Sequence, residues 1–172
     1  MKTLLALAAL LLTACNAAAM TLTSSDIIDG QPIPRANYYT HCSGQNIAPA
    51  LSWSGAPENT ESFAVTVIDR SVRPNGWSHW IVLHIPANVH ALPRGGALPA
   101  GASGVVSDFG DATYNGPCPP AGSGVHRYEF TVYAFAGHAF TLPPHVSAKQ
   151  IEELLSTAAS AKTTSTVTAQ MP

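Results

Sequence analysis

The chain has 172 residues, of which 46% are hydrophobic and only 10% are charged, and its formal net charge is −2. This composition excludes a disordered chain and a coiled coil, and a slightly acidic chain without long charged runs argues against a nucleic-acid partner. We therefore expect a compact globular protein.

The first residues have the layout of a secretory signal. Lys2 precedes an apolar run over residues 4–12 that is too short to span a bilayer. The letters LLTAC, which end at Cys15, resemble the lipobox of bacterial lipoproteins, so residues 1–14 are the expected signal peptide and Cys15 the expected lipidation site; cleavage after Ala19 is the alternative. The sequence thus predicts an exported protein, either periplasmic or attached to the cell envelope only through an N-terminal lipid.

Proline and glycine, 14 and 13 in number, separate short runs of alternating character. This pattern is typical of an all-β domain with many turns, and without an internal repeat we expect one domain over residues 20–172. The expected strands are Ser62–Asp69, His79–Ile85 and His126–Phe135, with weaker candidates at Leu51–Trp53 and Thr164–Ala169.

One helix is expected near the C-terminus. Ser147 and Gln150 have the spacing of a capping box. The apolar face that follows consists of Ile151, Leu154, Leu155 and Ala158. Strands first and one late helix predict a mainly β, antiparallel architecture with a C-terminal helix that packs on the sheet.

The cysteine count fits an exported protein. With lipid on Cys15, Cys42 and Cys118 remain as an even pair, and a disulfide between them is the expectation in an oxidising compartment. Closing such a long loop contributes about 4 kcal/mol in the entropic model. The alternative is two buried free thiols.

Three expected strands each carry an ionisable group at the end of an apolar file, that is, a row of apolar side chains on one face of the strand. Side chains in a strand alternate between its two faces, so each group shares a face with every second residue. Asp69 follows Phe63, Val65 and Val67 on one face of its strand. His79 precedes Ile81, Leu83 and Ile85 on one face of the next strand. His126 precedes Tyr128, Phe130 and Val132 in the same way.

The connection between the first two of these strands is short enough for an antiparallel pair, which places Asp69 near His79. If the third strand starts at the same edge, His126 and Tyr128 join them. The sequence then predicts one pocket with two imidazoles, a phenol and a carboxylate as its polar floor. Such groups suit a small anion held by charge-assisted hydrogen bonds.

Other functions remain open from the residues alone. Two histidines and one carboxylate are the ligand set of a non-haem iron site. A hydrolase would have to use the same groups without an evident nucleophile, since the chain has no G-x-S-x-G motif. A structural or interaction protein with a vestigial pocket is the third alternative. We expect no enzymatic activity, no metal and no cofactor.

Five segments carry a resemblance to a known family: CSGQNIAPALSW, FAVTVID, GWSHWIVLHIP, DFGDATYNGPCPP and GVHRYEFTVYAF. In order and spacing they resemble the phosphatidylethanolamine-binding protein family, in its bacterial branch of Raf-kinase-inhibitor-like proteins. The resemblance runs from about Leu22 to Phe135. It implies an antiparallel β-sandwich with a pocket for phosphate, acetate or a phosphorylated head group, and a non-enzymatic binding role that includes modulation of a partner protein.

By matching motif, the resemblance assigns ligand binding to Asp69, His79, His126, Tyr128, Pro74, Gly116, Pro117 and Cys118. The last three fall on a loop that forms part of the pocket wall.

The chain departs from the family at DRSVRP, where the family has D-P-D-A-P. Ser71 replaces the second acid, and Pro74 comes one residue late. We expect Arg70 and Arg73 to make the mouth of the pocket more attractive to anions; the alternative is two solvated arginines that contribute little. The C-terminal segment lacks the family's usual closing motif, which leaves open whether a lid covers the pocket.

Overall fold

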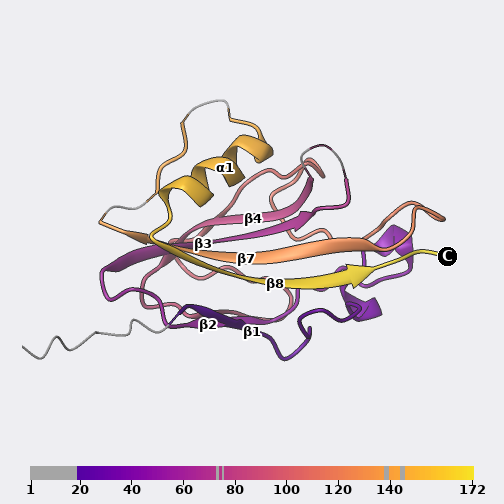
Figure 1. The fold of residues 1–172 in the computed structure, drawn as a ribbon, viewed down its shortest axis with the longest axis horizontal. Coiled ribbons are helices and arrows are strands. Elements are labelled where there is room, and N and C mark those ends of the chain that lie inside the picture. Colours follow the sequence, from indigo (N-terminus) through magenta and orange to yellow (C-terminus); the bar gives the residue numbers. More distant parts are fainter. Residues whose placement is uncertain (1–18, 73, 75, 138–139, 144–145) are drawn as a thin grey trace, which may run out of the picture.

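The computed structural model describes residues 19–72, 74, 76–137, 140–143 and 146–172 (Figure 1). The expected signal peptide, the lipidation site Cys15 and Arg73 lie outside the described residues. The described elements are β1 Thr21–Thr23, the 3-10 helices η1 Arg35–Asn37 and η2 Thr40–Cys42, β2 Leu51–Ser54, β3 Thr60–Asp69, β4 Trp77–Pro86, β5 Ala91–Leu92, β6 Ser103–Gly104, β7 His126–Ala136, α1 Ala148–Ala158 and β8 Ala161–Ala169.

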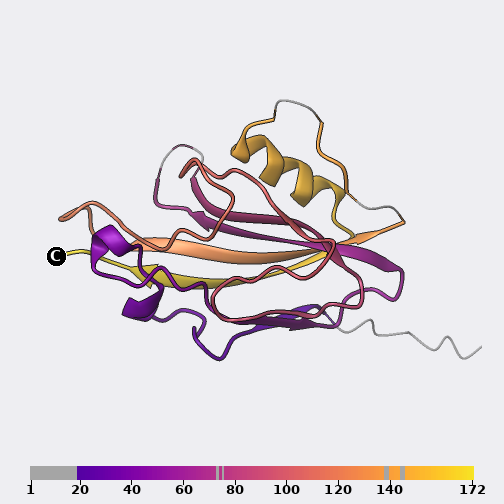
Figure 2. The same ribbon diagram turned by 180° about the vertical axis from the view of Figure 1, so that it is seen from behind.

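The strands form two antiparallel sheets. The larger has the order β6-β4-β3-β7-β8 and the smaller the order β1-β2-β5. Figures 1 and 2 place α1 and the smaller sheet on opposite sides of the larger sheet, so the molecule has three layers. The expected mainly β fold, an antiparallel sandwich with one helix near the C-terminus, is confirmed.

All five strands expected from the alternation of side chains are present, each as long as expected or longer by up to three residues at an end. The sequence pattern did not reveal β1, β5 and β6. These strands have two or three residues, which is too short for an alternating pattern to show. No helix among the described residues has the length and apolar character that a bilayer crossing requires.

The larger sheet is buried on both faces. On the side of the smaller sheet, Val65 and Val67 of β3 pack with Phe130 of β7. On the opposite side, Ile151 and Leu155 of α1 pack against the sheet. A fully buried aliphatic side chain contributes roughly 1.5–3 kcal/mol, so this contact holds the helix in place.

Helix α1 begins as expected from the sequence. The Ser147 side chain accepts the Gln150 N–H, and the Gln150 side chain accepts the Ser147 N–H, which completes the capping box. The packed face is narrower than expected, because Ala158 is exposed. The helix ends there, and the Ser160 N–H turns back to the Ala134 carbonyl.

Strand β4 contains an extra residue near its start. Val67 of β3 pairs with Trp80, yet the next residue, Ile68, pairs with Ser78. His79 is therefore left without a partner in β3, as the additional residue of a β-bulge. A bulge locally disrupts the alternation of faces and re-aims a side chain.

The expected file of His79 with Ile81, Leu83 and Ile85 is therefore wrong. Ile81 and Leu83 face α1, whereas Ile85 packs between the sheets. A second register shift accounts for Ile85, because His84 just before it adopts a left-handed backbone with φ of 57°. The first bulge turns His79 away from the helix-covered face and toward the space between the sheets.

Candidate functional site

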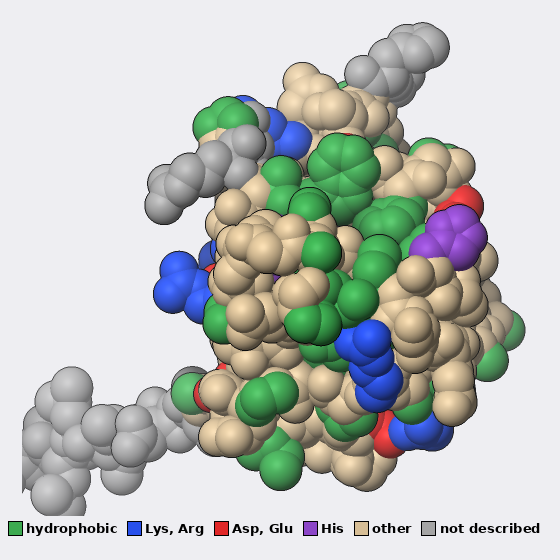
Figure 3. Space-filling model, turned by 90° about the vertical axis from the view of Figure 1, so that its right-hand side faces the viewer, with side chains coloured by type: hydrophobic (Ala, Val, Ile, Leu, Met, Phe, Trp, Pro, Cys, Tyr) green, Lys and Arg blue, Asp and Glu red, His purple; other side chains and the backbone are tan. Residues whose placement is uncertain are grey.

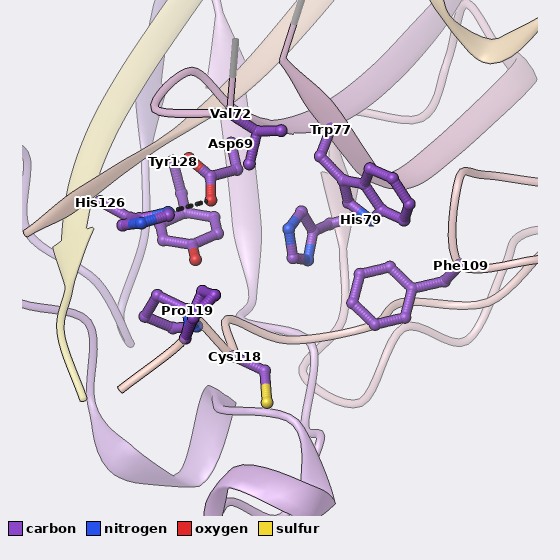
Figure 4. A pocket seen from close by; sticks show the side chains of 10 residues that line it. Asp69, Val72, Trp77, His79, Phe109, Cys118, Pro119, His126 and Tyr128 are labelled. Carbon is purple, nitrogen blue, oxygen red and sulfur yellow. Dashed lines mark hydrogen bonds and ion pairs between the residues drawn. The ribbon is translucent and has the colours of Figure 1, made fainter. Parts of the chain in front are cut away.

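A pocket of about 290 Å³ opens where β3 ends and where β4 and β7 begin. Asp69, the last residue of β3, pairs with Trp77 of β4 on one side and Tyr128 of β7 on the other. His126 is the first residue of β7. The antiparallel register therefore brings these residues to one edge of the sheet, as expected, and the bulge adds His79 (Figure 4).

The carboxylate of Asp69 and the imidazole of His126 form a buried pair. The distance from His126 Nδ1 to Asp69 Oδ2 is 2.6 Å, and the two side chains are 9% and 3% exposed. The second carboxylate oxygen accepts the Ser71 N–H at 2.8 Å. Because a carboxylate accepts hydrogen bonds, Asp69 fixes the hydrogen of His126 on Nδ1.

His79 is held by the backbone of the next loop. Its Nδ1 lies 2.8 Å from the Asn115 carbonyl oxygen, which only accepts, so Nδ1 carries the hydrogen. Burial lowers the pKa of His79 below its ordinary value of 6.5, against the opposing effect of this hydrogen bond. The ring is therefore neutral at pH 7, and the lone pair is on Nε2.

Tyr128 supplies a hydroxyl to the pocket. Its ring stands edge-on to His79, with 5.1 Å between the ring centroids. Burial, followed by the nearby Asp69 carboxylate, raises the pKa of Tyr128. The phenol consequently stays protonated and can donate, and Figure 4 shows its oxygen pointing toward Pro119.

The walls of the pocket are mostly apolar. They consist of Val72, Trp77, Phe109, Cys118, Pro119 and Pro120. Phe109 packs against the His79 ring at a centroid distance of 4.8 Å and against Trp77 at 6.3 Å. Figure 3 shows this end of the molecule, where hydrophobic side chains gather on the surface.

The structure brings together most, not all, of the expected site residues. Asp69, His79, His126, Tyr128 and Cys118 line the pocket. Cys118 is the one wall residue that the sequence predicted to bind ligand. Trp77 and Phe109 lie inside the motifs GWSHW and DFGDAT, but a search for polar groups does not select them.

The remaining expected residues, Pro74, Gly116 and Pro117, do not line the pocket. Pro74 is exposed in the loop before β4. Gly116 and Pro117 are buried behind the wall, where a Cβ on Gly116 would lie 1.9 Å from the Asn37 carbonyl oxygen. The Pro117 carbonyl accepts the Tyr39 N–H at 3.1 Å. Close backbone packing at Gly116 and Pro117 therefore supports the wall.

The expected disulfide between Cys42 and Cys118 is present, across a separation of 76 residues. It ties the pocket loop to η2, the 3-10 helix that ends at Cys42. Cys118 is thereby fixed in the wall by a covalent bond.

The expectation for Arg70 is wrong. Its Nε lies 2.6 Å from Glu129 Oε2 and its Nη1 lies 2.9 Å from Glu152 Oε2, so the guanidinium joins β7 and α1 and does not line the pocket mouth. The hydrogen bonds to Glu152 and then Glu129 raise the pKa of Arg70 despite its partial burial. A cation neutralised by two carboxylates adds little attraction for an anion.

Among the described residues, no three histidine, cysteine, aspartate or glutamate side chains are arranged to hold a metal ion. In particular, His79 Nδ1 and His126 Nδ1 are both engaged within the protein.

Known proteins are similar to this chain in sequence and in fold. The family model of the phosphatidylethanolamine-binding protein matches residues 23–170. The protein YbcL of Escherichia coli is 41% identical over 145 residues, and the match covers 78% of this chain and 79% of YbcL. YbhB of the same organism is 39% identical over 123 residues, and the match covers 67% of this chain and 77% of YbhB. A Mycobacterium tuberculosis protein named as a lipoprotein, LppC, is 38% identical over 141 residues, 82% of this chain and 67% of its own.

Solved structures agree with this assignment. The crystal structure of E. coli YbcL, described as a member of the mammalian PEBP family, superposes with a TM-score of 0.83 at 34% identity and covers 90% of this chain and 100% of its own. A homologue from Chlamydia trachomatis gives a TM-score of 0.75 at 30% identity, with 90% and 99% of the chains covered. The chain therefore belongs to the phosphatidylethanolamine-binding protein family, in the bacterial group that includes YbcL and YbhB.

Proposed function

We propose that the protein binds small anions or phosphorylated ligands in this pocket and leaves them chemically unchanged. The observation that carries the proposal is the polar floor, in which the buried His126–Asp69 pair, Tyr128 and His79 meet beneath apolar walls. Few polar groups that converge inside an apolar concavity are typical of a small-molecule site.

Tyr128 and His79, the hydrogen-bond donors on the floor of the pocket, differ in whether they can donate to an anion without first gaining a proton. The Tyr128 hydroxyl is protonated and donates to an anion directly. His79 donates its Nδ1 hydrogen to Asn115, so it donates to an anion only through a proton added on Nε2. Binding of an anion beside this nitrogen favours that proton and thus couples binding to proton uptake.

The expected affinity for an inorganic anion is low. Each charge-assisted hydrogen bond contributes roughly 1.5–3 kcal/mol. Two such bonds give about 4 kcal/mol, which corresponds to a dissociation constant of about 1 mM. An organic group on the ligand adds affinity by contact with Trp77 and Phe109, which stand in the wall.

We also propose that the protein acts at the cell envelope, anchored by lipid on Cys15, where it modulates a partner protein. The letters LLTAC support the anchor, as does the name of the mycobacterial relative. The disulfide agrees with an oxidising compartment.

Calorimetric titration with inorganic phosphate tests the binding function. We expect saturable 1:1 binding by the wild type and a loss of at least about tenfold in affinity for Tyr128→Phe, which removes one donor of about 1.5 kcal/mol without changing the ring. His41→Ala, which removes an exposed imidazole outside the pocket lining, is the matched control and should bind as wild type does. Absence of saturable binding, or equal affinity in Tyr128→Phe, would contradict the proposal and favour an interaction protein with a vestigial pocket.

A further inference from the structure

A serine hydroxyl stands beside the His126–Asp69 pair. Ser123 Oγ lies 3.0 Å from His126 Nε2, while Nδ1 of the same ring lies 2.6 Å from Asp69 Oδ2. Ser123 is exposed and is not among the residues that line the anion pocket. We propose that Ser123 is a nucleophile, activated by His126 and positioned by Asp69, that accepts the acyl group of small carboxylic esters.

The hydrogen-bond directions favour a base at Nε2. Asp69 fixes the hydrogen of the neutral ring on Nδ1, so the lone pair is on Nε2, which faces the Ser123 hydroxyl. The carboxylate also stabilises the imidazolium that forms when the ring takes a proton. Asp69 is itself held by the Ser71 N–H at 2.8 Å, which fixes its orientation.

The loop presents the serine outward. Gly122 and Gly124 on either side have positive φ values of 76° and 89°, and a Cβ at either position would meet no atom within 4 Å. The Gly124 N–H, directly after the serine, has no acceptor within the described part of the chain. An N–H in this place can donate to the oxyanion that forms when a serine attacks a carbonyl.

One competing bond must change before attack. The Ser123 hydroxyl donates to the Pro120 carbonyl oxygen at 2.6 Å. Rotation about the single Cβ–Oγ bond turns the hydrogen toward Nε2 at 3.0 Å, so no movement of the backbone is needed.

The chemical step balances with the groups present. Ser123 Oγ attacks the ester carbonyl carbon, and its proton passes to His126 Nε2. The tetrahedral intermediate collapses, the C–O bond to the leaving group breaks, and the alkoxide takes the proton from His126. Water, activated by His126 in the same way, then hydrolyses the acyl-Ser123 ester to a carboxylic acid and restores the serine.

The chain contains a matched control for this arrangement. Ser103 Oγ lies 3.1 Å from His84 Nδ1, and it is exposed like Ser123. The other ring nitrogen of His84 lies 2.8 Å from the Phe140 carbonyl oxygen. In the arrangement around Ser123, the corresponding nitrogen of His126 lies beside the Asp69 carboxylate. A neutral carbonyl stabilises an imidazolium less than a carboxylate does, so Ser103 should remain unreactive.

The inference goes beyond anion binding and can fail separately from it. Tyr128→Phe removes a donor of the pocket floor and leaves Ser123, His126 and Asp69 in place. This variant should keep the reactive serine while it loses affinity for phosphate. Ser123→Ala should show the opposite combination.

Labelling with diisopropyl fluorophosphate tests the inference. In this reaction Ser123 Oγ bonds to phosphorus and fluoride leaves. The protein is expressed from its full-length sequence, purified as the cell processes it, and followed by intact mass and peptide mapping. We expect one adduct per chain, located on Ser123, in the wild type and in Ser103→Ala, and none in Ser123→Ala. His126→Ala should be labelled about 100-fold more slowly, because general-base catalysis typically contributes 10²–10⁴-fold.

The test of Asp69 must distinguish positioning of His126 from a purely structural role. We expect slow labelling of Asp69→Asn and partial recovery in Asp69→Glu, which restores the carboxylate, with circular dichroism to verify that both variants are folded. The inference is overturned if the wild type gives no adduct while a known serine hydrolase is labelled in parallel. It is equally overturned if the adduct lies on another residue or if His126→Ala reacts at the wild-type rate.

Discussion

The Nδ1 of His79 donates to the carbonyl oxygen of Asn115 over 2.8 Å, so the other nitrogen of this buried ring is the one left for a ligand. Burial lowers the pKa of His79 below 6.5, so the free protein presents an acceptor there at pH 7 and a donor only after protonation. This relationship predicts that anion binding in the pocket depends on pH.

We predict that affinity for sulfate, whose charge is constant between about pH 5 and pH 8, increases as the pH falls through this range. The reason is that His79 gains a proton in the complex, so each unit of pH contributes up to about 1.4 kcal/mol. Calorimetry in two buffers of different ionisation enthalpy measures the proton uptake. His79→Gln should bind more weakly at low pH and lose this dependence, and an unchanged dependence would contradict the assignment.

The same group predicts a loss of stability in acid. The pKa of His79 is lower in the folded state than the ordinary 6.5, so the unfolded chain binds the proton more readily. Stability should therefore fall as the pH drops below about 6.5, by up to about 1.4 kcal/mol per unit, until the folded ring also protonates. Urea unfolding of wild type and His79→Gln at several pH values measures this effect: the acid-dependent loss should be absent in His79→Gln, and the difference between the two proteins should be constant above neutrality.

Removal of the Arg70 cation should destabilise the protein without changing anion affinity. Arg70→Met leaves Glu129 and Glu152 without their partner, at a cost of about 1–3 kcal/mol in the free energy of unfolding. The exposed pair of Lys149 and Glu153 is the control, and Lys149→Met should cost less than about 0.5 kcal/mol. Urea unfolding and phosphate titration of both variants give the comparison; weaker phosphate binding by Arg70→Met would place the guanidinium in the site after all.

Loss of the disulfide should reduce stability strongly. Replacement of Cys42 and Cys118 by alanine removes a cross-link across 76 residues, which corresponds to about 4 kcal/mol in the entropic model. Thermal unfolding with and without reductant measures the effect. Reductant should destabilise the wild type and leave the double variant unchanged, and equal stability of the two proteins would show that the cross-link is dispensable.

The close packing at Gly116 yields a fourth stability test. In Gly116→Ala the new methyl group meets the Asn37 carbonyl oxygen, so we expect a loss of about 1–3 kcal/mol and weaker phosphate binding as the wall shifts. Gly110→Ala is the control: its φ is 89° but its Cβ meets nothing, so only about 1 kcal/mol of backbone strain is expected. Urea unfolding separates the two, and a Gly116→Ala variant no less stable than Gly110→Ala would be inconsistent with the tight contact.

The alternation of side chains predicted the long strands and the convergence of Asp69, His126 and Tyr128, because β3 and β7 keep a regular register over this stretch. It failed for β4. The extra residue at His79 produces no signal in the sequence, since a bulge depends on pairing with a neighbouring strand. His79 reached the expected pocket through this irregularity, and not along the file that the sequence indicated.

The sequence also did not reveal hydrogen-bond and ion-pair partners that are distant in the chain. The carboxylates that pair with Arg70 are 59 and 82 residues away, so its neighbours in DRSVRP indicate only a free cation. Ser123 lies only three residues before His126 in GSGVH, but its glycine neighbours indicate a turn and not a contact with the imidazole. A turn with two glycines that bends a serine back onto the next strand leaves no G-x-S-x-G motif.

Cys118 belongs at once to the wall of the pocket and to a bond with a distant loop. Reduction of this bond would release the wall from η2 without breaking the backbone, so the redox state of the surroundings acts on the pocket directly. The pocket wall should therefore keep its position best in an oxidising environment.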